Sequence, residues 1–219
     1  MSHSWEVHCL ILSTHSGYFS RLCRSEFKEG EEGKVTLKDD PIVAVQLMIG
    51  YFYKLDYDPC DPAISKLPYG PDEEHNNTKW VWYQVHAWLL VIADKYEVQG
   101  LAALALRNLE ANLCDAFIAN TPAQTMHLLS ADLIKATEYI YEHPPPNSDR
   151  VRQAIVHAFM HQRDRIVRFA NKDDFEQLLA KIPEFAADYL RVVTGIRPGE
   201  GETTTSKTPK KTKEVTNPA

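Results

Sequence analysis

Apolar residues recur at three- and four-residue spacing along much of the chain, and this periodicity constrains the fold more than any other feature. Residues three and four apart lie on the same face of an α-helix, so each such run predicts an amphipathic helix. The runs comprise Tyr18–Leu22, Val45–Phe52, Val85–Tyr96, Leu101–Leu109, Met126–Tyr141, 148–166 and Phe175–Val193. The sequence therefore predicts helices in both halves of the chain.

Glycine and proline divide these runs. Gly100 interrupts the pattern near the middle of the chain, so the runs on either side of it are predicted to form a helical hairpin. Three prolines at 144–146 should end one helix, and Pro183 should kink or split the last one. Residues 61–79 are polar and rich in proline, which predicts an exposed insertion loop outside the core. The segment 196–219 is too polar to fold alone.

Two short segments alternate between apolar and polar residues, which is the pattern of β-strands. They are Trp5–Val7 and Lys34–Leu37, and the second is followed by Asp39-Asp40-Pro41, which is expected to cap a helix start. The predicted fold class is therefore α+β. A small sheet flanked by helices is expected over residues 1–118, followed by an all-helical extension over 119–195 and then by the polar tail.

Composition excludes several classes of function. The 219 residues carry a formal net charge of −6, so no strong positive field favours direct binding to nucleic acid or to an anionic membrane. The apolar run Trp88–Ala93, preceded by Ala87, is far shorter than a membrane span, and the N-terminus does not resemble a signal peptide. The four cysteines form no CxxC pair. They are expected to be reduced thiols in a cytoplasmic or nuclear protein.

Five short blocks in the first half resemble the BTB/POZ domain. They are Val7–Ser13 with Ser16–Phe19, Phe27–Glu29, Val35–Leu37 with Asp39-Asp40, Tyr51–Tyr53 with Asp56-Tyr57, and Ala93–Leu101. The first is similar to the family pattern H-x-x-x-L-x-x-x-S-x-Y-F, and the last is similar to a segment of many fungal members. The resemblance covers residues 5–113, about half of the chain.

The resemblance implies a protein-protein interaction module and not an enzyme. Family members self-associate or recruit partners, and some are adaptors that bind a cullin scaffold of a ubiquitin ligase. Phe27 and Glu29 resemble the hydrophobic-x-Glu motif that docks a cullin, with Tyr18 and Tyr53 as further partner contacts. Members usually begin with an additional strand that completes the sheet and contributes to a swapped dimer. A chain that begins at the second strand would leave a sheet edge uncovered.

Several of these residues also have a purely structural interpretation. Phe27 could simply pack the end of its helix, with Glu29 in solvent. His8, the histidine of the first block, is expected to be buried or half-buried and bonded to the backbone. Asp173-Asp174 is interpreted as favourable charge at a helix start.

The aromatic residues Tyr69, Trp80, Trp82 and Tyr83 beside the insertion loop form either an exposed patch or part of the core. His157 and His161 lie four residues apart and would share a helix face. A solvated surface is favoured there over a metal site, because no third ligand is patterned.

Two alternative functions remain open at this stage. Lys207, Lys210, Lys211 and Lys213 resemble a weak nuclear-import signal, which suits a transcription-linked scaffold that recruits corepressors. A metal hydrolase built on the histidine pair is the third hypothesis. No cofactor is expected for the favoured interpretation, in which the partners are proteins: a second copy of the chain or a cullin scaffold.

Overall fold

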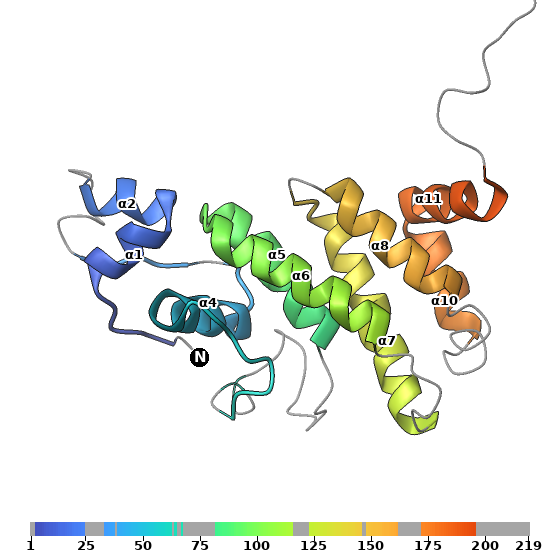
Figure 1. Cartoon of the computed structure of the whole chain (residues 1–219), viewed down its shortest axis with the longest axis horizontal. Coiled ribbons are helices and arrows are strands. Elements are labelled where there is room, and N and C mark those ends of the chain that lie inside the picture. Colours follow the sequence, from blue (N-terminus) through green and yellow to red (C-terminus); the bar gives the residue numbers. More distant parts are fainter. Residues whose placement is uncertain are drawn as a thin grey trace, which may run out of the picture.

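The computed structural model describes residues 3–24, 33–37, 39–62, 64, 67, 82–115, 123–145, 148–161 and 172–195. Within these ranges the regular elements are helices (Figure 1). In chain order they are α1 (Cys9–His15), α2 (Gly17–Arg24), α4 (Ile42–Lys54), α5 (Trp82–Lys95), α6 (Gln99–Asp115), α7 (Ala123–Glu142), α8 (Ser148–His161), α10 (Lys172–Lys181) and α11 (Pro183–Thr194). The side chains of residues 114, 115, 123–130, 161 and 172 are outside the described part.

The prediction of an α+β fold with a small sheet is wrong for the described part of the chain. Residues 3–8 and 34–37 contain no strand, although both were predicted to pair. Val7, Val35 and Leu37 pack individually against the helical core. Alternation over three or four residues specifies side chains on two faces of a segment, but it does not supply a pairing partner, and very short two-stranded sheets are marginal in water.

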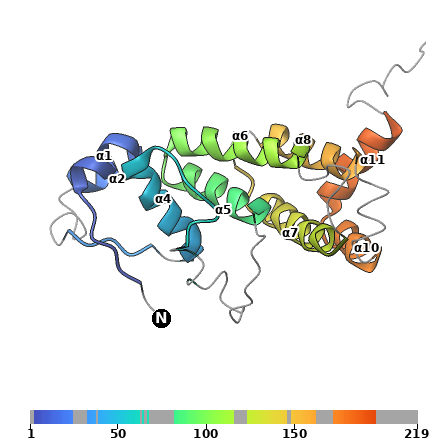
Figure 2. The same cartoon turned by 60° about the horizontal axis from the view of Figure 1, so that its bottom comes forward.

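Helix α5 lies at the centre of the molecule and is buried around nearly its whole circumference. Its buried side chains are Tyr83, Val85, His86, Ala87, Trp88, Leu89, Leu90, Ile92 and Ala93. It packs against α4, α6 and α7, and Figure 2 shows α5 running between the N-terminal helices and the C-terminal ones. One continuous cluster of buried side chains extends from Leu12 in α1 to Phe185 in α11.

The hairpin of α5 and α6 confirms the prediction for this region, but its turn is not at Gly100. The chain reverses at Tyr96–Val98, where Glu97 has a left-handed backbone with φ of 53°. Gly100 lies in the first turn of α6, and a Cβ atom there would overlap the Tyr51 hydroxyl. This glycine therefore permits the close approach of α4 to α6 and does not end a helix.

Three residues of the predicted stripe in α4, Val45, Met48 and Phe52, are buried, and the fourth, Ile49, is half-buried. The buried surface of α4 is wider than the stripe, because it also includes Val43, Ala44, Leu47 and Tyr51. The insertion-loop prediction fails at one described position: Ile64 is buried, so the start of the 61–79 segment is part of the core. Most of the remaining residues of that segment lie outside the described ranges, as does the tail after Gly195.

The C-terminal helices pack around an aromatic cluster. Phe159 of α8 contacts Phe175 of α10 and Phe185 of α11, with ring centroids 5.6 and 5.2 Å apart. The predicted split at Pro183 is confirmed, because this proline is the first residue of α11, where its missing N–H costs no helical hydrogen bond. The hydroxyl of Tyr141 donates to Asp188 at 2.9 Å and ties α7 to α11.

Helix α7 supplies the cap for the start of α5. The Asp132 carboxylate is buried and accepts hydrogen bonds from the backbone N–H groups of Tyr83, at 2.8 Å, and Gln84, at 3.3 Å. The first N–H groups of a helix lack intrahelical acceptors, so a side chain from another helix here satisfies groups that burial would leave unpaired. Burial raises the pKa of Asp132 to about 7, while the two N–H donors oppose this shift.

Replacing this cap should destabilise the whole molecule. Asp132→Ala leaves two backbone donors unpaired at the buried start of α5 and should lower the free energy of unfolding by about 1–3 kcal/mol. Asp132→Asn keeps one acceptor oxygen and should cost less. Urea unfolding followed by circular dichroism at pH 7.5 measures both. Equal stability of Asp132→Ala and the wild type would contradict the capping role.

Candidate interaction surface

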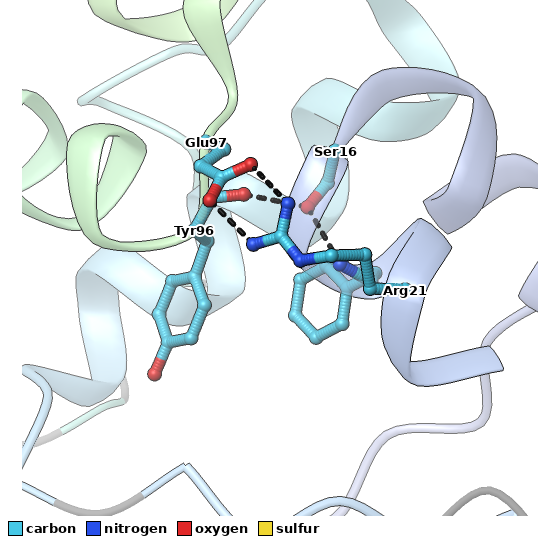
Figure 3. Close-up of polar contacts among 5 residues, drawn as sticks. Ser16, Arg21, Tyr96 and Glu97 are labelled. Carbon is cyan, nitrogen blue, oxygen red and sulfur yellow. Dashed lines mark hydrogen bonds and ion pairs between the residues drawn. The ribbon is translucent and has the colours of Figure 1, made fainter. Parts of the chain in front are cut away.

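Ser16 joins the α1–α2 pair to the α5–α6 turn (Figure 3). It lies between α1 and α2, and its buried hydroxyl donates to the carbonyl oxygen of Tyr96 at 2.6 Å. The Ser16 Oγ atom also accepts a hydrogen bond from the backbone N–H of Phe19 at 3.0 Å, three residues on, which is the geometry of a helix N-cap. One hydroxyl therefore both starts α2 and attaches the pair to the body.

A charged pair lies beside this joint. The Arg21 guanidinium binds the Glu97 carboxylate through two nitrogens, one of them at 2.8 Å (Figure 3). The pairing raises the pKa of Arg21 and lowers the pKa of Glu97. Both side chains are exposed, so solvent screens the attraction and the pair adds orientation more than stability. Gly17 allows the approach, since a Cβ atom there would overlap the Glu97 carboxylate.

Tyr18, predicted to contact a partner, is half-buried against this joint. Its ring meets the rings of Phe19 and Tyr96 edge to face, with centroids 5.2 and 5.1 Å apart. Edge-to-face pairs of this kind stabilise a core beyond the area they bury. Tyr18 therefore has a structural role in the described contacts, and a role in partner binding stays a prediction.

Tyr53, the other predicted partner contact in the described residues, is 45% exposed on α4. Its hydroxyl accepts from the backbone N–H of His8 at 3.1 Å and lies 3.0 Å from the His8 Nδ1 atom. The expectation that His8 is buried or half-buried is wrong, because its side chain is exposed beside Tyr53. The contact fixes the start of α1 against the end of α4.

Two exposed leucines flank this contact in sequence. Leu10 is 79% exposed and lies two residues after His8, while Leu55 is 58% exposed and lies two residues after Tyr53. Leu55 is also in the left-handed region, with φ of 56°, an uncommon conformation for a branched apolar residue. We refer to His8, Leu10, Tyr53 and Leu55 as the α1/α4 face.

The remaining predicted contacts have different outcomes. Phe27 and Glu29 lie outside the described residues, beyond the end of α2 at Arg24. Of the aromatic group, Tyr83 is buried and Trp82 half-buried, which favours the core interpretation for these two. Tyr69 and Trp80 are outside the described part.

Asp40 does not cap α4 as predicted. The first residue before that helix is Pro41, which makes no side-chain cap bond. The Asp40 carboxylate instead accepts from the Lys95 ammonium, at 2.8 and 2.9 Å, and from the Tyr96 hydroxyl at 2.5 Å. An aspartate directly before a proline is typical of a helix start, so the sequence predicted that Asp40 caps α4. The fold instead brings the end of α5 within reach of the Asp40 carboxylate. Asp40 thus ties the segment before α4 to the hairpin.

A second disagreement concerns the cysteines. Cys9 and Cys23 form a disulfide between α1 and α2, so the prediction of reduced thiols is wrong for this pair. Their separation of 14 residues matches no short redox motif, and they meet only because the chain reverses at Ser16. Cys60 is a free, exposed thiol. The side chain of Cys114 is outside the described part.

A buried polar network that the sequence interpretation missed holds the hairpin to residue 57. The Asn112 amide donates a hydrogen bond to Nε2 of His86 at 2.7 Å. Because Nε2 accepts, the proton of the neutral imidazole lies on Nδ1. Nδ1 in turn donates to the Tyr57 hydroxyl at 2.6 Å. Burial lowers the pKa of His86 to about 4. The available signal was a histidine within the apolar run of α5.

This network predicts a pH dependence. The native pKa of His86 lies below its usual value of 6.5, so the unfolded chain binds more protons between about pH 4 and 6.5, and stability should fall as pH drops through that window. The slope from one group is at most about 1.4 kcal/mol per pH unit. His86→Gln cannot titrate, so urea unfolding at pH 7.5, 6.5 and 5.5 should show the variant losing less stability on acidification. Parallel losses in both proteins would contradict the assignment.

The histidine pair on α8 gains no support as a metal site. His157 and His161 both lie in α8, and the side chain of His161 is outside the described part. Among the described side chains, no group of three histidine, cysteine, aspartate or glutamate residues could hold a metal ion.

One cavity lies beside α4. Its volume is about 160 Å³, and Lys54, Asp56 and Tyr57 are among the residues that line it. Small-molecule sites are commonly about 300–1,000 Å³, so the volume gives little argument for such a ligand.

No protein-family model matches this chain, and a search of curated proteins found no significant match. None of the helices in the described ranges is long and apolar enough to cross a membrane. The α1/α4 face and the resemblance of the sequence blocks are therefore the features that bear on function.

Proposed function

We propose that this chain is a non-catalytic protein-interaction module related to BTB/POZ domains, and that it self-associates through the α1/α4 face. The observation that carries the proposal is the exposure of Tyr53, which contacts His8, and of Leu10 and Leu55, which lie two residues after His8 and Tyr53 in the sequence. Exposed apolar and aromatic side chains on a fixed scaffold are the usual anchors of protein interfaces.

The order of helices supports the relation to BTB/POZ domains. The resemblance implies the order strand, helix pair, strand, helix and helical hairpin. The two strands are absent from residues 3–8 and 34–37, but the helices α1–α2, α4 and α5–α6 follow in the expected order. Ser16 and Tyr96, which belong to the first and the last of the resembling blocks, bind each other at the joint. Contact between distant blocks is expected when they belong to one structural unit.

The scaffold holds the face in a defined position. Tyr53 extends from α4, whose other side is buried against α5, and His8 precedes α1, which Ser16 anchors through Tyr96. A preorganised surface loses less conformational entropy on binding than a mobile one. This arrangement suits recognition by packing, and a second copy of the chain would present the same face in a two-fold dimer.

We propose that the chain also acts as an adaptor, and that its partner in this role is a cullin scaffold. Phe27 and Glu29 follow α2, the helix whose start is fixed at Ser16. An aromatic anchor beside a charged rim residue is a common form of interface hot spot. This second contact is separate in sequence from the α1/α4 face, so the two can be tested independently.

Self-association is tested with matched leucine substitutions in the full chain. Leu10→Asp with Leu55→Asp should weaken self-association at least about tenfold, since a buried anchor residue contributes on the order of 1–2 kcal/mol to an interface. Leu190→Asp is the control, because Leu190 is 58% exposed on α11. Sedimentation equilibrium measures the dissociation constants. A monomeric wild type, or equal effects of all the substitutions, would contradict the proposal.

Cullin binding is tested with Phe27→Ala and Glu29→Ala. Each should weaken binding of a cullin N-terminal domain to the full chain, by about tenfold or more for the aromatic anchor. The Leu10→Asp, Leu55→Asp variant should bind the cullin domain as a monomer with little change at this site. Calorimetric titration checks both. No binding by the wild type would remove the adaptor role and leave self-association as the proposed function.

A further inference from the structure

The disulfide closes the open end of the α1–α2 pair. Cys9 is the first residue of α1 and Cys23 is next to the last residue of α2, whereas Ser16 joins the helices at their other end. The Cα atoms of the two cysteines are 6.5 Å apart, within the range of about 4.4–6.8 Å that disulfides span. The bond therefore crosslinks two helix ends that the backbone does not connect directly.

Few other contacts hold α1 in place. It has 7 residues and buries the side chain of Leu12, and α2 has 8 residues and buries Phe19. His8, at the N-cap position of α1, makes no side-chain cap bond. Helices this short are marginal without packing or caps, so α1 depends on its crosslink, on the Ser16 joint, on the His8–Tyr53 contact and on the packing of Ile11 against the core.

The sulfur atoms are also reachable from solvent. Cys9 is exposed and Cys23 is half-buried, so an external thiolate can attack the Cys9 sulfur without unfolding the core. Access to one sulfur is the structural requirement for exchange with small thiols. Exposed disulfides are commonly the more labile ones, whereas structural disulfides resist reduction through a low reduction potential.

We propose that Cys9 and Cys23 form a reversible thiol–disulfide site, with thiols and disulfides of the glutathione class as reductant and oxidant. The oxidised form fixes α1 and with it the α1/α4 face. This regulatory consequence rests on the proposed self-association, whereas the exchange site itself does not.

The exchange balances with two equivalents of thiol. A glutathione thiolate attacks the Cys9 sulfur, the Cys9–Cys23 bond breaks, and its electron pair leaves on the Cys23 sulfur, which takes up a proton. A second thiolate then attacks the glutathione sulfur of the mixed disulfide and releases the Cys9 thiol. The products are two cysteine thiols and one glutathione disulfide. Oxidation is the reverse, with glutathione disulfide as the two-electron oxidant.

Reduction should act on the face through the first turn of α1. Cys9 directly follows His8, whose contact with Tyr53 joins α1 to α4, and directly precedes the exposed Leu10. When the crosslink opens, the first turn of α1 loses a covalent restraint while Ser16 still holds its far end. We expect Leu10 to become less ordered and self-association to weaken.

The exchange site is tested on the full chain equilibrated with defined ratios of reduced to oxidised glutathione. After acid quenching and alkylation, peptide mapping should find Cys9 linked to Cys23 under oxidising conditions and both alkylated under reducing ones, with the link restored on reoxidation. Cys60, which is exposed and unpaired, serves as the internal reference for a free thiol. If Cys9 and Cys23 are alkylated like Cys60 at every ratio, with no linked peptide, the proposal is overturned.

The consequence for the face is tested with serine variants. Cys9→Ser and Cys23→Ser should each behave like the reduced wild type, with faster hydrogen exchange in α1 and self-association weakened on the order of tenfold, a usual size for coupling between two sites. Cys60→Ser should behave like the oxidised wild type. Unchanged exchange and association in the two serine variants would overturn the regulatory role.

The two proposals fail differently. A wild type that forms and breaks the Cys9–Cys23 bond but stays monomeric in both states would sink the proposed self-association and support the exchange site. A wild type that associates through Leu10 and Leu55 with equal strength in both redox states would support self-association and overturn the control by the disulfide.

Discussion

Helix α5 imposes the constraint on which the rest of the structure depends. Its apolar residues occupy nearly every side, so the helix is stable only when it is covered from several directions at once. Helices α4, α6 and α7 supply that cover. Two sets of polar groups that this arrangement buries bind side chains of other elements: Asp132 caps the helix start, and Tyr57 and Asn112 bind His86. The N-terminal and C-terminal helices are thus arranged around one buried axis.

The sequence predicted the helices well because helical periodicity is a local property. The stripe in α4, the hairpin and the split at Pro183 each follow from residues within a few turns of one another. The prediction of a sheet was wrong because strand pairing is not a local property. Trp5–Val7 and Lys34–Leu37 have strand-like alternation, but pairing depends on a distant partner, and each segment packs its apolar side chains against helices instead.

The contacts of the candidate site were less accessible from sequence. Tyr53 was identified as a surface residue through the family resemblance, but its partner His8 is 45 positions away, and the Ser16–Tyr96 bond spans 80 positions. No local pattern encodes such separations. Asp40 is an example. The local pattern predicted that it caps α4, whereas in the fold its carboxylate binds the distant residues Lys95 and Tyr96. The exposure of Leu10 and Leu55 was likewise visible only once the fold was known.

The distribution of buried contacts explains why regulation would fall on the N-terminal helices. The residues around α5 are held by packing on several sides, so local opening there approaches global unfolding. By contrast, α1 and α2 each bury one side chain, and their attachment depends on Ser16, on the His8–Tyr53 contact, on the Arg21–Glu97 pair and on the Cys9–Cys23 crosslink. A covalent bond has the greatest effect on order where non-covalent contacts are fewest. The element that carries Leu10 is therefore the one whose order a redox change can alter while the core remains folded.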